Sequence, residues 1–412
     1  MRSTSCRDLA EETLRQCIAG RPPKELPRAL AQDACGQALF SILVEGLADR
    51  FDPALVDAYA RLFPQAIAHV RPGTFADSLV ARYERVRKIR PIAGRPHRIF
   101  ILSRVTLGAD VAVTSVMFAA AKRRFPHAEL VFVGPKKNYE LLAGDSRIHH
   151  APIEYRRGSL RERLAVWDDL CRVLEDQQSA VIDPDSRLTQ LGLLPVCAED
   201  HYHLFESRKY GADSARSLPE LASDWAAETF GVAGAKPYVA LGRMPQREPY
   251  IAVNLGVGEN PAKRLPDPFE EELLRLLAAT GLPLVVDKGG GPEEGARVMG
   301  AVERSGAAAS LWEGSFAGFA AIIAGSRLYV GYDSAGQHVA AACGIPLISV
   351  FAGFPVPRMF DRWRPSGEQC RVIRVERPQV EATLAQVREA VRDVMPAGSR
   401  QSVSAPQSGG TA

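Results

Sequence analysis

The chain has 412 residues, of which 46% are hydrophobic and 24% charged, and its formal net charge is +3. This length suggests two or three domains and excludes a single small module. The near-neutral charge argues against a protein that binds nucleic acid along a basic stripe, so no nucleic-acid partner is expected.

Seven cysteines are present, an odd number, and no two have Cys-x-x-Cys spacing. Neither a zinc ribbon nor a redox dithiol is therefore indicated. A disulfide framework is not expected at this size either, and a reducing compartment is the simpler interpretation. Asp8, Glu11 and Glu12 occupy the stretch where a signal peptide would need apolar residues. We expect a cytoplasmic protein.

The first 92 residues predict helices. Leu39, Leu43 and Leu47 fall near helical spacing, and Asp52-Pro53 is a plausible helix start before another apolar periodic stretch. Pro, Gly and Arg then dominate residues 90–98, which we interpret as a linker.

From residue 98 onward, apolar strand-like runs alternate with helical segments, which predicts parallel sheets. In the first half, strands are expected at 98–103, 128–134 and 179–185, and helices at 111–125 and 159–177. After about residue 230 the alternation restarts, with strands expected at 249–258, 282–291, 327–333 and 345–353. The helices between them are expected at 267–281, 292–306, 315–326 and 334–344. Two consecutive α/β domains should enclose a cleft, because such sheets bind ligands at the carboxyl ends of their strands.

We therefore divide the chain into a helical extension and two Rossmann-like domains, followed by a closing helix and a small polar tail expected to be disordered. The ranges are 1–92, 93–230, 231–378, 379–396 and 397–412. The window 334–357 lacks Asp, Glu, Lys and Arg and is long enough to span a bilayer. Gly344 and Pro346 interrupt it, so a buried helix, a turn and a buried strand are expected instead.

Three glycine-rich loops follow predicted strands. The loop 289–295 lacks the last glycine of a dinucleotide fingerprint, because Glu294 stands there. The loop 256–264 fails as a Walker A motif, since Ala262 and Arg264 flank its lysine. In the third loop a strand ends at Asp333 and small residues open a helix, whose free backbone N–H groups can bind a diphosphate. The alternative is that Asp333 only caps this helix and His338 packs internally.

The segment GYDSAGQHVAAACGIPLISVFAG, residues 331–353, resembles the signature of glycosyltransferase family 9, the heptosyltransferases of lipopolysaccharide core assembly. Four more segments resemble that family in the same order, at 98–126, 180–194, 259–266 and 290–295. The resemblance covers about residues 97–395, and the first 92 residues have no recognised counterpart.

This resemblance implies a two-domain GT-B fold of the α/β class. It implies transfer of a sugar, such as heptose, from an ADP-sugar to a glycan or lipopolysaccharide-type acceptor. The family inverts the anomeric centre without a metal or other cofactor. A lipid-linked acceptor would bring the protein into peripheral contact with the inner face of the membrane.

The resemblance also assigns site residues. Asp110 corresponds to the family's base, but Ala109 is inserted between it and Gly108, so Asp110 is either the base or a helix N-cap. Lys263 matches the lysine that neutralises the leaving ADP. The other donor-side residues are Arg264, Glu294 (with Glu293 as an alternative), Asp333, Ser334, Ala335, Gly336 and His338. On the acceptor side stand Arg104 and Thr114.

Two other functions stay open at this point. The chain could be a non-catalytic nucleotide-sugar-binding or scaffolding protein, which the inserted Ala109 favours, with residues 1–92 as its interaction module. It could also be another GT-B enzyme, such as a sugar-nucleotide epimerase. The acceptor, the exact donor and the oligomeric state do not follow from the sequence.

Overall fold

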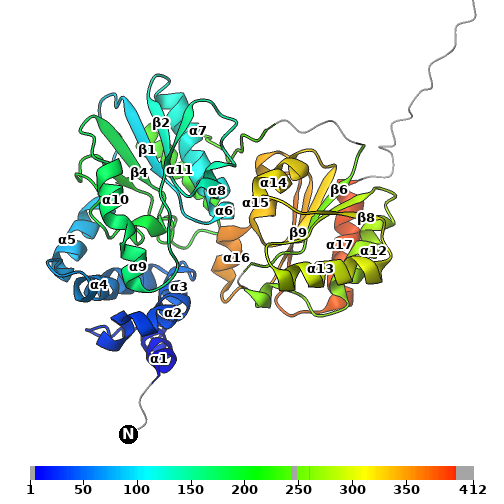
Figure 1. Cartoon of the computed structure of the whole chain (residues 1–412), viewed down its shortest axis with the longest axis horizontal. Coiled ribbons are helices and arrows are strands. Elements are labelled where there is room, and N and C mark those ends of the chain that lie inside the picture. The colour runs from blue at the N-terminus through cyan, green and yellow to red at the C-terminus, as the bar shows by residue number, and fades with distance from the viewer. Residues whose placement is uncertain (1–4, 243–247, 259, 396–412) are drawn as a thin grey trace, which may run out of the picture.

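The computed structural model describes residues 5–242, 248–258 and 260–395. Two α/β lobes lie side by side, and the N-terminal helices, blue in Figure 1, lie beneath the first lobe. The predicted tail 397–412 and Glu259 of the predicted phosphate loop lie outside the described residues.

The first lobe is built on a parallel sheet of order β3-β2-β1-β4-β5. The strands are β1 (Arg98–Leu102), β2 (Glu129–Gly134), β3 (Ile148–Pro152), β4 (Ser179–Asp183) and β5 (Tyr202–Leu204). The helices are α6 (Leu107–Ala109), α7 (Ser115–Arg124), α8 (Lys136–Tyr139), α9 (Leu160–Leu164), α10 (Val166–Val173) and α11 (Leu218–Phe230).

The second lobe has a parallel sheet of order β11-β10-β9-β6-β7-β8. The strands are β6 (Ile251–Asn254), β7 (Leu284–Asp287), β8 (Ala309–Trp312), β9 (Leu328–Tyr332), β10 (Leu347–Phe351) and β11 (Cys370–Arg374). The helices are α12 (Phe269–Ala278), α13 (Pro292–Ser305), α14 (Phe316–Ala324), α15 (Ala335–Ala342), α16 (Pro357–Trp363) and α17 (Val380–Val394). The α/β class and the two parallel sheets expected from the sequence are confirmed.

The N-terminal extension forms part of the first lobe's core. It contains α1 (Cys6–Ile18), α2 (Gly36–Ala38), α3 (Glu45–Ala48), α4 (Pro53–Val70) and α5 (Ala76–Val86). Side chains alternate across a strand, so β1 divides between two cores. Ile99 and Ile101 belong to the cluster that includes α7 and α11, whereas Phe100 and Leu102 belong to the cluster that includes the extension. The extension therefore helps to cover one face of this sheet.

Helix α16 connects the lobes, and Figure 1 shows it between them. Its Arg362 is 1% exposed and donates hydrogen bonds to the backbone carbonyls of Ala212, Ser214 and Arg216 in the first lobe. Arg358 forms an ion pair with Asp213 at 2.6 Å. These contacts fix how the two sheets face each other.

Two features differ from the sequence expectations. A disulfide joins Cys6 of α1 to Cys35, with a Cα–Cα distance of 5.3 Å, because the helices of the extension fold back on one another. The cysteine spacing did not indicate this pair. The helix predicted over 159–177 is divided at Ala165 into α9 and α10.

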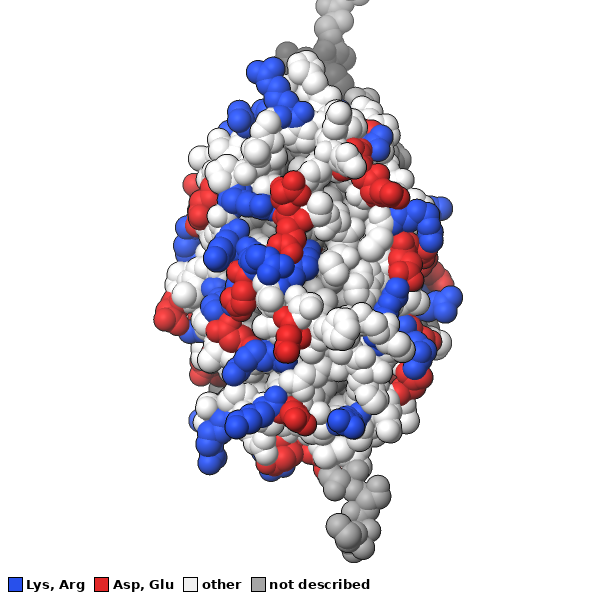
Figure 2. Space-filling view, turned by 90° about the vertical axis from the view of Figure 1, so that its left-hand side faces the viewer, with Lys and Arg blue, Asp and Glu red and all other residues white. Residues whose placement is uncertain are grey.

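The charge-free window from residue 334 to 357 forms α15, a turn and β10, as expected. Among the described residues, no helix combines the length and apolar character needed to cross a membrane. On the face drawn in Figure 2, positive and negative side chains are interspersed, and no continuous basic stripe forms.

Because the extension shares a core with the first sheet, we predict that Leu43→Ala destabilises the lobe. Leu43 is 2% exposed within the shared cluster, so its truncation should cost about 2–5 kcal/mol. Ile18 of α1 is 45% exposed, and Ile18→Ala should cost about 0.5 kcal/mol or less. Denaturant unfolding of both variants measures the difference. Equal, small losses would show that the extension does not stabilise the lobe.

Candidate active site

The site lies where the carboxyl ends of the two sheets meet. Helix α6, after β1, touches the start of α15, after β9. A Cβ atom on Gly108 would lie 3.1 Å from the Ala335 Cα atom and 3.1 Å from His338 Cδ2. Only a glycine allows the backbones to approach this closely. The predicted catalytic loop and the predicted donor helix are thus in direct contact.

Asp110 is held in place by a full set of hydrogen bonds. Its side chain is buried, with 3% exposure of the residue. Oδ1 accepts from the Arg104 backbone N–H at 2.7 Å and from Thr114 Oγ1 at 2.6 Å. Oδ2 accepts from Ser103 Oγ and Asn138 Nδ2, both at 2.6 Å. These four donors occupy about as many sites as an ionised carboxylate offers.

Burial raises the pKa of Asp110, while the hydrogen bonds from Ser103, Thr114, Arg104 and Asn138 lower it by a smaller amount. A base with a raised pKa removes a proton more readily than an ordinary aspartate does. To act as a base, the carboxylate must release one of its present donors to an incoming hydroxyl.

The backbone around Asp110 shows how the inserted residue is accommodated. Residues Asp110–Thr114 form a π-helical turn between α6 and α7. A π turn holds one more residue than an α turn and often occurs at functional sites. Asp110 has helical φ and ψ, and Thr106 takes the N-cap position instead. The alternative role of Asp110 as a helix N-cap is therefore wrong.

Arg104, predicted on the acceptor side, is anchored rather than free. Its Nη1 donates to the Pro184 carbonyl and to Ser207 Oγ, the latter at 2.9 Å. Its guanidinium lies 5.9 Å from the centre of the Trp363 ring. Burial lowers the pKa of Arg104, although Asp185 and Asp110 act in the opposite direction.

Lys263 and Asp333, both predicted on the donor side, form an ion pair. Lys263 Nζ lies 2.7 Å from Asp333 Oδ2, and the lysine side chain is 19% exposed. The backbone after β10 packs against this lysine. Gly353 has φ of +69°, and a Cβ there would lie 2.7 Å from the Lys263 backbone nitrogen. Residue 353 must therefore be glycine for the lysine to sit beside the end of β9.

The start of α15 presents an uncapped helix end next to this pair. Ser334 is its N-cap, and its side chain makes no capping hydrogen bond. Tyr329 OH lies 3.4 Å from Ser334 Oγ, and the same ring packs against the backbone at Gly336. Backbone N–H groups at such an end, together with the helix dipole, favour an anion.

His338 lies one turn further along α15 and joins the lobes. It is 5% exposed and packs edge to face against Trp363, with the ring centres 6.0 Å apart. Burial lowers the pKa of His338 to about 4, so its imidazole is neutral near pH 7. It can donate or accept a hydrogen bond, but it supplies no positive charge to a phosphate.

Glu294 and Arg264 lie on the outer side of the donor region. Glu294 folds back over the strand ends, and its Oε2 accepts from the Gly290 backbone N–H at 2.9 Å. Glu293 is exposed, so the geometry favours Glu294 for a role at the nucleotide. Arg264 turns toward α12, where it pairs with Asp267 and with Glu270. The structure thus places Lys263 beside Asp333 and Arg264 away from that pair.

Four further charged residues belong to the acceptor side, none of them predicted from the sequence. Arg208 is paired with Asp185, from Nε to Oδ2 at 2.8 Å, and both are buried. Burial raises the pKa of Asp185, but Arg208 more than offsets this and the net shift is downward. The other two, Arg187 and Asp49, have no hydrogen bond or ion pair to their side chains within the described part of the chain.

Arg187 lies in the segment 180–194 that suggested the family, but nothing in that pattern singled it out. Asp49 belongs to the extension, for which no pattern was recognised. Only the tertiary structure brings these residues to the cleft.

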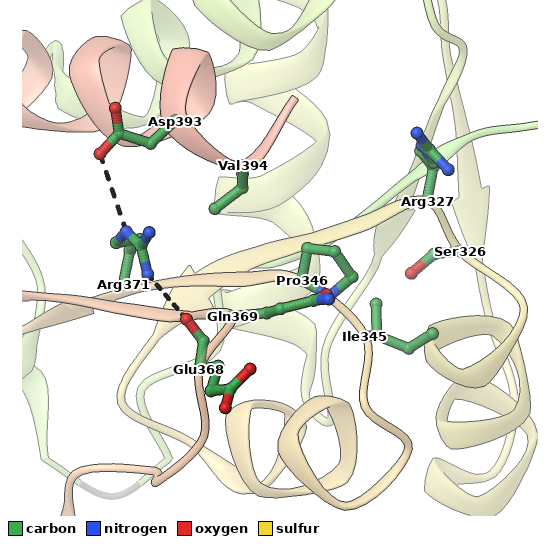
Figure 3. Close-up of a pocket in the computed structure, with 9 residues that line it drawn as sticks. All are labelled: Ser326, Arg327, Ile345, Pro346, Glu368, Gln369, Arg371, Asp393 and Val394. Carbon is green, nitrogen blue, oxygen red and sulfur yellow. Dashed lines mark hydrogen bonds and ion pairs between the residues drawn. The ribbon is translucent and has the colours of Figure 1, made fainter. Parts of the chain in front are cut away.

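A separate pocket lies at the amino ends of strands of the second sheet, opposite the candidate site. It has a volume of about 440 Å³ and is lined at the amino ends of β9, β10 and β11, as Figure 3 shows for Arg327, Pro346 and Gln369. Ligands of doubly wound sheets bind at the carboxyl ends, so this pocket is not the candidate active site. Within 5–242, 248–258 and 260–395, no cluster of three or more His, Cys, Asp or Glu residues is arranged to hold a metal ion.

Comparison with known proteins identifies a family to which part of the chain is similar. The model of glycosyltransferase family 9 (heptosyltransferase) matches residues 190–389. No curated protein matches the sequence.

Several solved structures share the fold. The E. coli heptosyltransferase WaaC with ADP is 18% identical, with a TM-score of 0.54, over 71% of this chain and 99% of that one. The E. coli ADP-heptose heptosyltransferase II is 19% identical, with a TM-score of 0.52, over 72% and 98%. A family 9 glycosyltransferase from Veillonella parvula is 16% identical, with a TM-score of 0.54, over 74% and 91%. The resemblance seen in the sequence is thus confirmed: residues 190–389 match the model of glycosyltransferase family 9 (heptosyltransferase), and the chain has the GT-B fold of the solved heptosyltransferases.

Proposed function

We propose that the protein transfers a heptose-like sugar from an ADP-activated donor to a hydroxyl of a glycan or lipopolysaccharide-type acceptor, with inversion and without a metal ion or other cofactor. The observation that carries this proposal is the contact of α6 with α15, which joins the segment that leads into the buried Asp110 to the helix that follows Asp333, the partner of Lys263. The reaction belongs in the cytoplasm, and a lipid-linked acceptor would bring the protein to the inner face of the membrane.

The donor site is formed by Lys263, Asp333 and the start of α15. The diphosphate would accept hydrogen bonds from backbone N–H groups at Ala335 and Gly336, and Lys263 would leave Asp333 to contact a phosphate oxygen. Asp333 would then be available to a sugar hydroxyl. A cation at this position stabilises the negative charge that develops on the leaving ADP. Structures of the similar enzyme WaaC with ADP and with ADP-2-deoxy-2-fluoro-heptose support the choice of donor.

Asp110 is the proposed general base. An acceptor hydroxyl that displaces one of its four donors would transfer its proton to the carboxylate as the new glycosidic bond forms. Thr114 and the Arg104 backbone hold the other oxygen, so the carboxylate keeps its orientation during this exchange. Hydrogen bonds in structures without ligand often rearrange when substrate binds.

A thermal-shift screen with ADP, UDP, GDP and their sugars tests the donor. A ligand that binds only the folded protein raises its melting temperature. At a ligand concentration of 100 times the Kd, it increases the free energy of unfolding by about 2.7 kcal/mol. We expect ADP and ADP-heptose to stabilise the protein and the other nucleotides to have smaller effects. Absence of any response would overturn the proposal and favour a scaffolding protein.

Lys263→Met should weaken ADP binding by about 1.5–3 kcal/mol, or about 10- to 150-fold, because a charged hydrogen bond to phosphate is lost. Isothermal calorimetry measures the change. Lys24→Met is the matched control, since Lys24 is an exposed lysine of the N-terminal extension and not of the donor lobe. Unchanged affinity in the Lys263 variant would remove this lysine from the site.

The rate should depend on the ionisation of Asp110. Burial raises its pKa, and only the ionised form accepts a proton, so kcat/KM should fall as the pH drops through a value above that of an ordinary aspartate. Asp110→Asn should lower the rate by about 10²–10⁴-fold while ADP affinity is retained. A pH–rate profile and calorimetry provide the measurements. Full turnover by Asp110→Asn would show that another group is the base.

A further inference from the structure

The turn between α3 and α4 reaches the junction of the two lobes. Phe51 in this turn has φ of +53°, an uncommon conformation for a bulky residue. Its carbonyl accepts a hydrogen bond from Arg358 of α16 at 2.9 Å, and its ring packs edge to face on Trp363 at 6.3 Å. Backbone strain of this kind persists only where surrounding contacts hold it. The turn is therefore fixed against the second lobe.

Trp363 locates this turn relative to the active site. The same indole ring contacts His338 of α15 and lies beneath the guanidinium of Arg104. The donor helix, the first loop of the acceptor lobe and the turn of the extension thus converge on one side chain. Asp49, two residues before Phe51, lies beside this point of convergence.

Asp49 is a carboxylate without a side-chain partner among residues 5–242, 248–258 and 260–395. It is partly buried, and within the described residues its side chain makes no hydrogen bond or ion pair. Burial raises the pKa of Asp49, while the charges of Arg187, Arg208, Arg104 and Lys263, in that order, lower it. The first three belong to the acceptor lobe and the last to the donor lobe, so charges of both lobes act on Asp49, in keeping with the position of the neighbouring Phe51 at the lobe junction.

The neighbouring cations also have unused donors. Arg187 has no side-chain partner within the described residues, and Nη1 of the buried Arg208 is unpaired. An unsatisfied buried donor costs about 1–3 kcal/mol, so a ligand that accepts its hydrogen bond is favoured. Asp49 accepts hydrogen bonds and Arg187 donates them, and together they match hydroxyl groups, which do both.

We propose that the N-terminal extension completes the acceptor site, with Asp49 and Arg187 binding neighbouring hydroxyl groups of an uncharged, polyhydroxylated acceptor. This inference rests on the proposed function and adds a substrate class to it. Asp110 accepts four hydrogen bonds in this structure, so it binds a hydroxyl only by releasing one of these donors. Asp49 offers a free carboxylate, and its negative charge offsets the positive charge that would otherwise attract an anionic acceptor.

The first experiment tests the charge of the site with inorganic sulfate as an anion probe, titrated into the protein saturated with ADP. The Asp49→Asn variant should bind sulfate with an affinity at least about fivefold higher than that of the wild-type protein, because a nearby negative charge is removed. Adding Arg187→Gln to that variant should abolish the gain. Asp33→Asn, an exposed carboxylate of the same extension, should have no effect. Unchanged sulfate affinity in Asp49→Asn would overturn the placement of Asp49.

The second experiment measures slow hydrolysis of ADP-heptose, in which water takes the place of the acceptor hydroxyl. Asp49→Asn should lower kcat about tenfold or more with KM for the donor nearly unchanged, because water that occupies the place of the acceptor hydroxyls loses its hydrogen bond to Asp49 and is no longer oriented. Asp49→Glu should recover part of the rate, which loss of structure alone would not allow. Unchanged kcat in Asp49→Asn would overturn the inference.

The two experiments separate this inference from the proposed function. If the unchanged protein does not hydrolyse ADP-heptose, the proposed donor is wrong, and the sulfate titration then decides whether Asp49 and Arg187 share a binding site. If it does hydrolyse ADP-heptose but the Asp49 variants behave like Asp33→Asn, the proposed function stands and the role of Asp49 is wrong.

Discussion

The close approach of α6 to α15 is the constraint on which the site depends. With glycine at residue 108, the first loop of the acceptor lobe packs directly on Ala335 and His338 of the donor helix. The buried Arg362 of α16 holds the same arrangement from the other side of the cleft through three backbone carbonyls. Because these contacts join the lobes near the carboxyl ends of parallel sheets, the loops that follow the strands there border the space between the lobes.

In this structure the polar groups of the site bind one another. Lys263 pairs with Asp333, and Asp110 takes hydrogen bonds from four donors. Substrate binding is therefore an exchange of partners, in which the ligand must replace contacts that already satisfy these charges. Such exchange costs little in desolvation, because the groups are already withdrawn from water, and it favours ligands that reproduce the geometry of the contacts they replace.

The sequence predicted the centre of each sheet but not its edges. Strands β1, β2 and β4 of the first sheet and β6, β7, β9 and β10 of the second were all expected. Strands β3, β5, β8 and β11, which were not, are the four edge strands. Central parallel strands are buried on both faces and form continuous apolar runs. An edge strand such as β3, with His149 and His150, or β11, with Arg371 and Arg374, mixes polar and apolar residues and shows no such run.

The candidate site likewise contains residues that the sequence predicted and residues that it did not. Lys263, Asp333 and the start of α15 belong to continuous segments that follow predicted strands, so local pattern and resemblance together pointed to them. Arg187 and Arg208 follow strands as well, but a surface arginine and a site arginine have the same appearance in a sequence. Trp363, on which three elements converge, carries no local signal, because its importance comes only from contacts between residues far apart in the chain.

The extension changes the interpretation of the near-neutral net charge. On the acceptor side, the three arginines Arg104, Arg187 and Arg208 are equal in number to the three carboxylates Asp49, Asp110 and Asp185. Without the extension, the net charge of these groups would be positive, and the acceptor side would attract phosphorylated or acidic acceptors from a distance. Asp49 removes that attraction at the point where the acceptor must dock. Recognition then depends on the fit of hydroxyl groups rather than on charge, and the same helices that cover the first sheet also determine what the cleft selects.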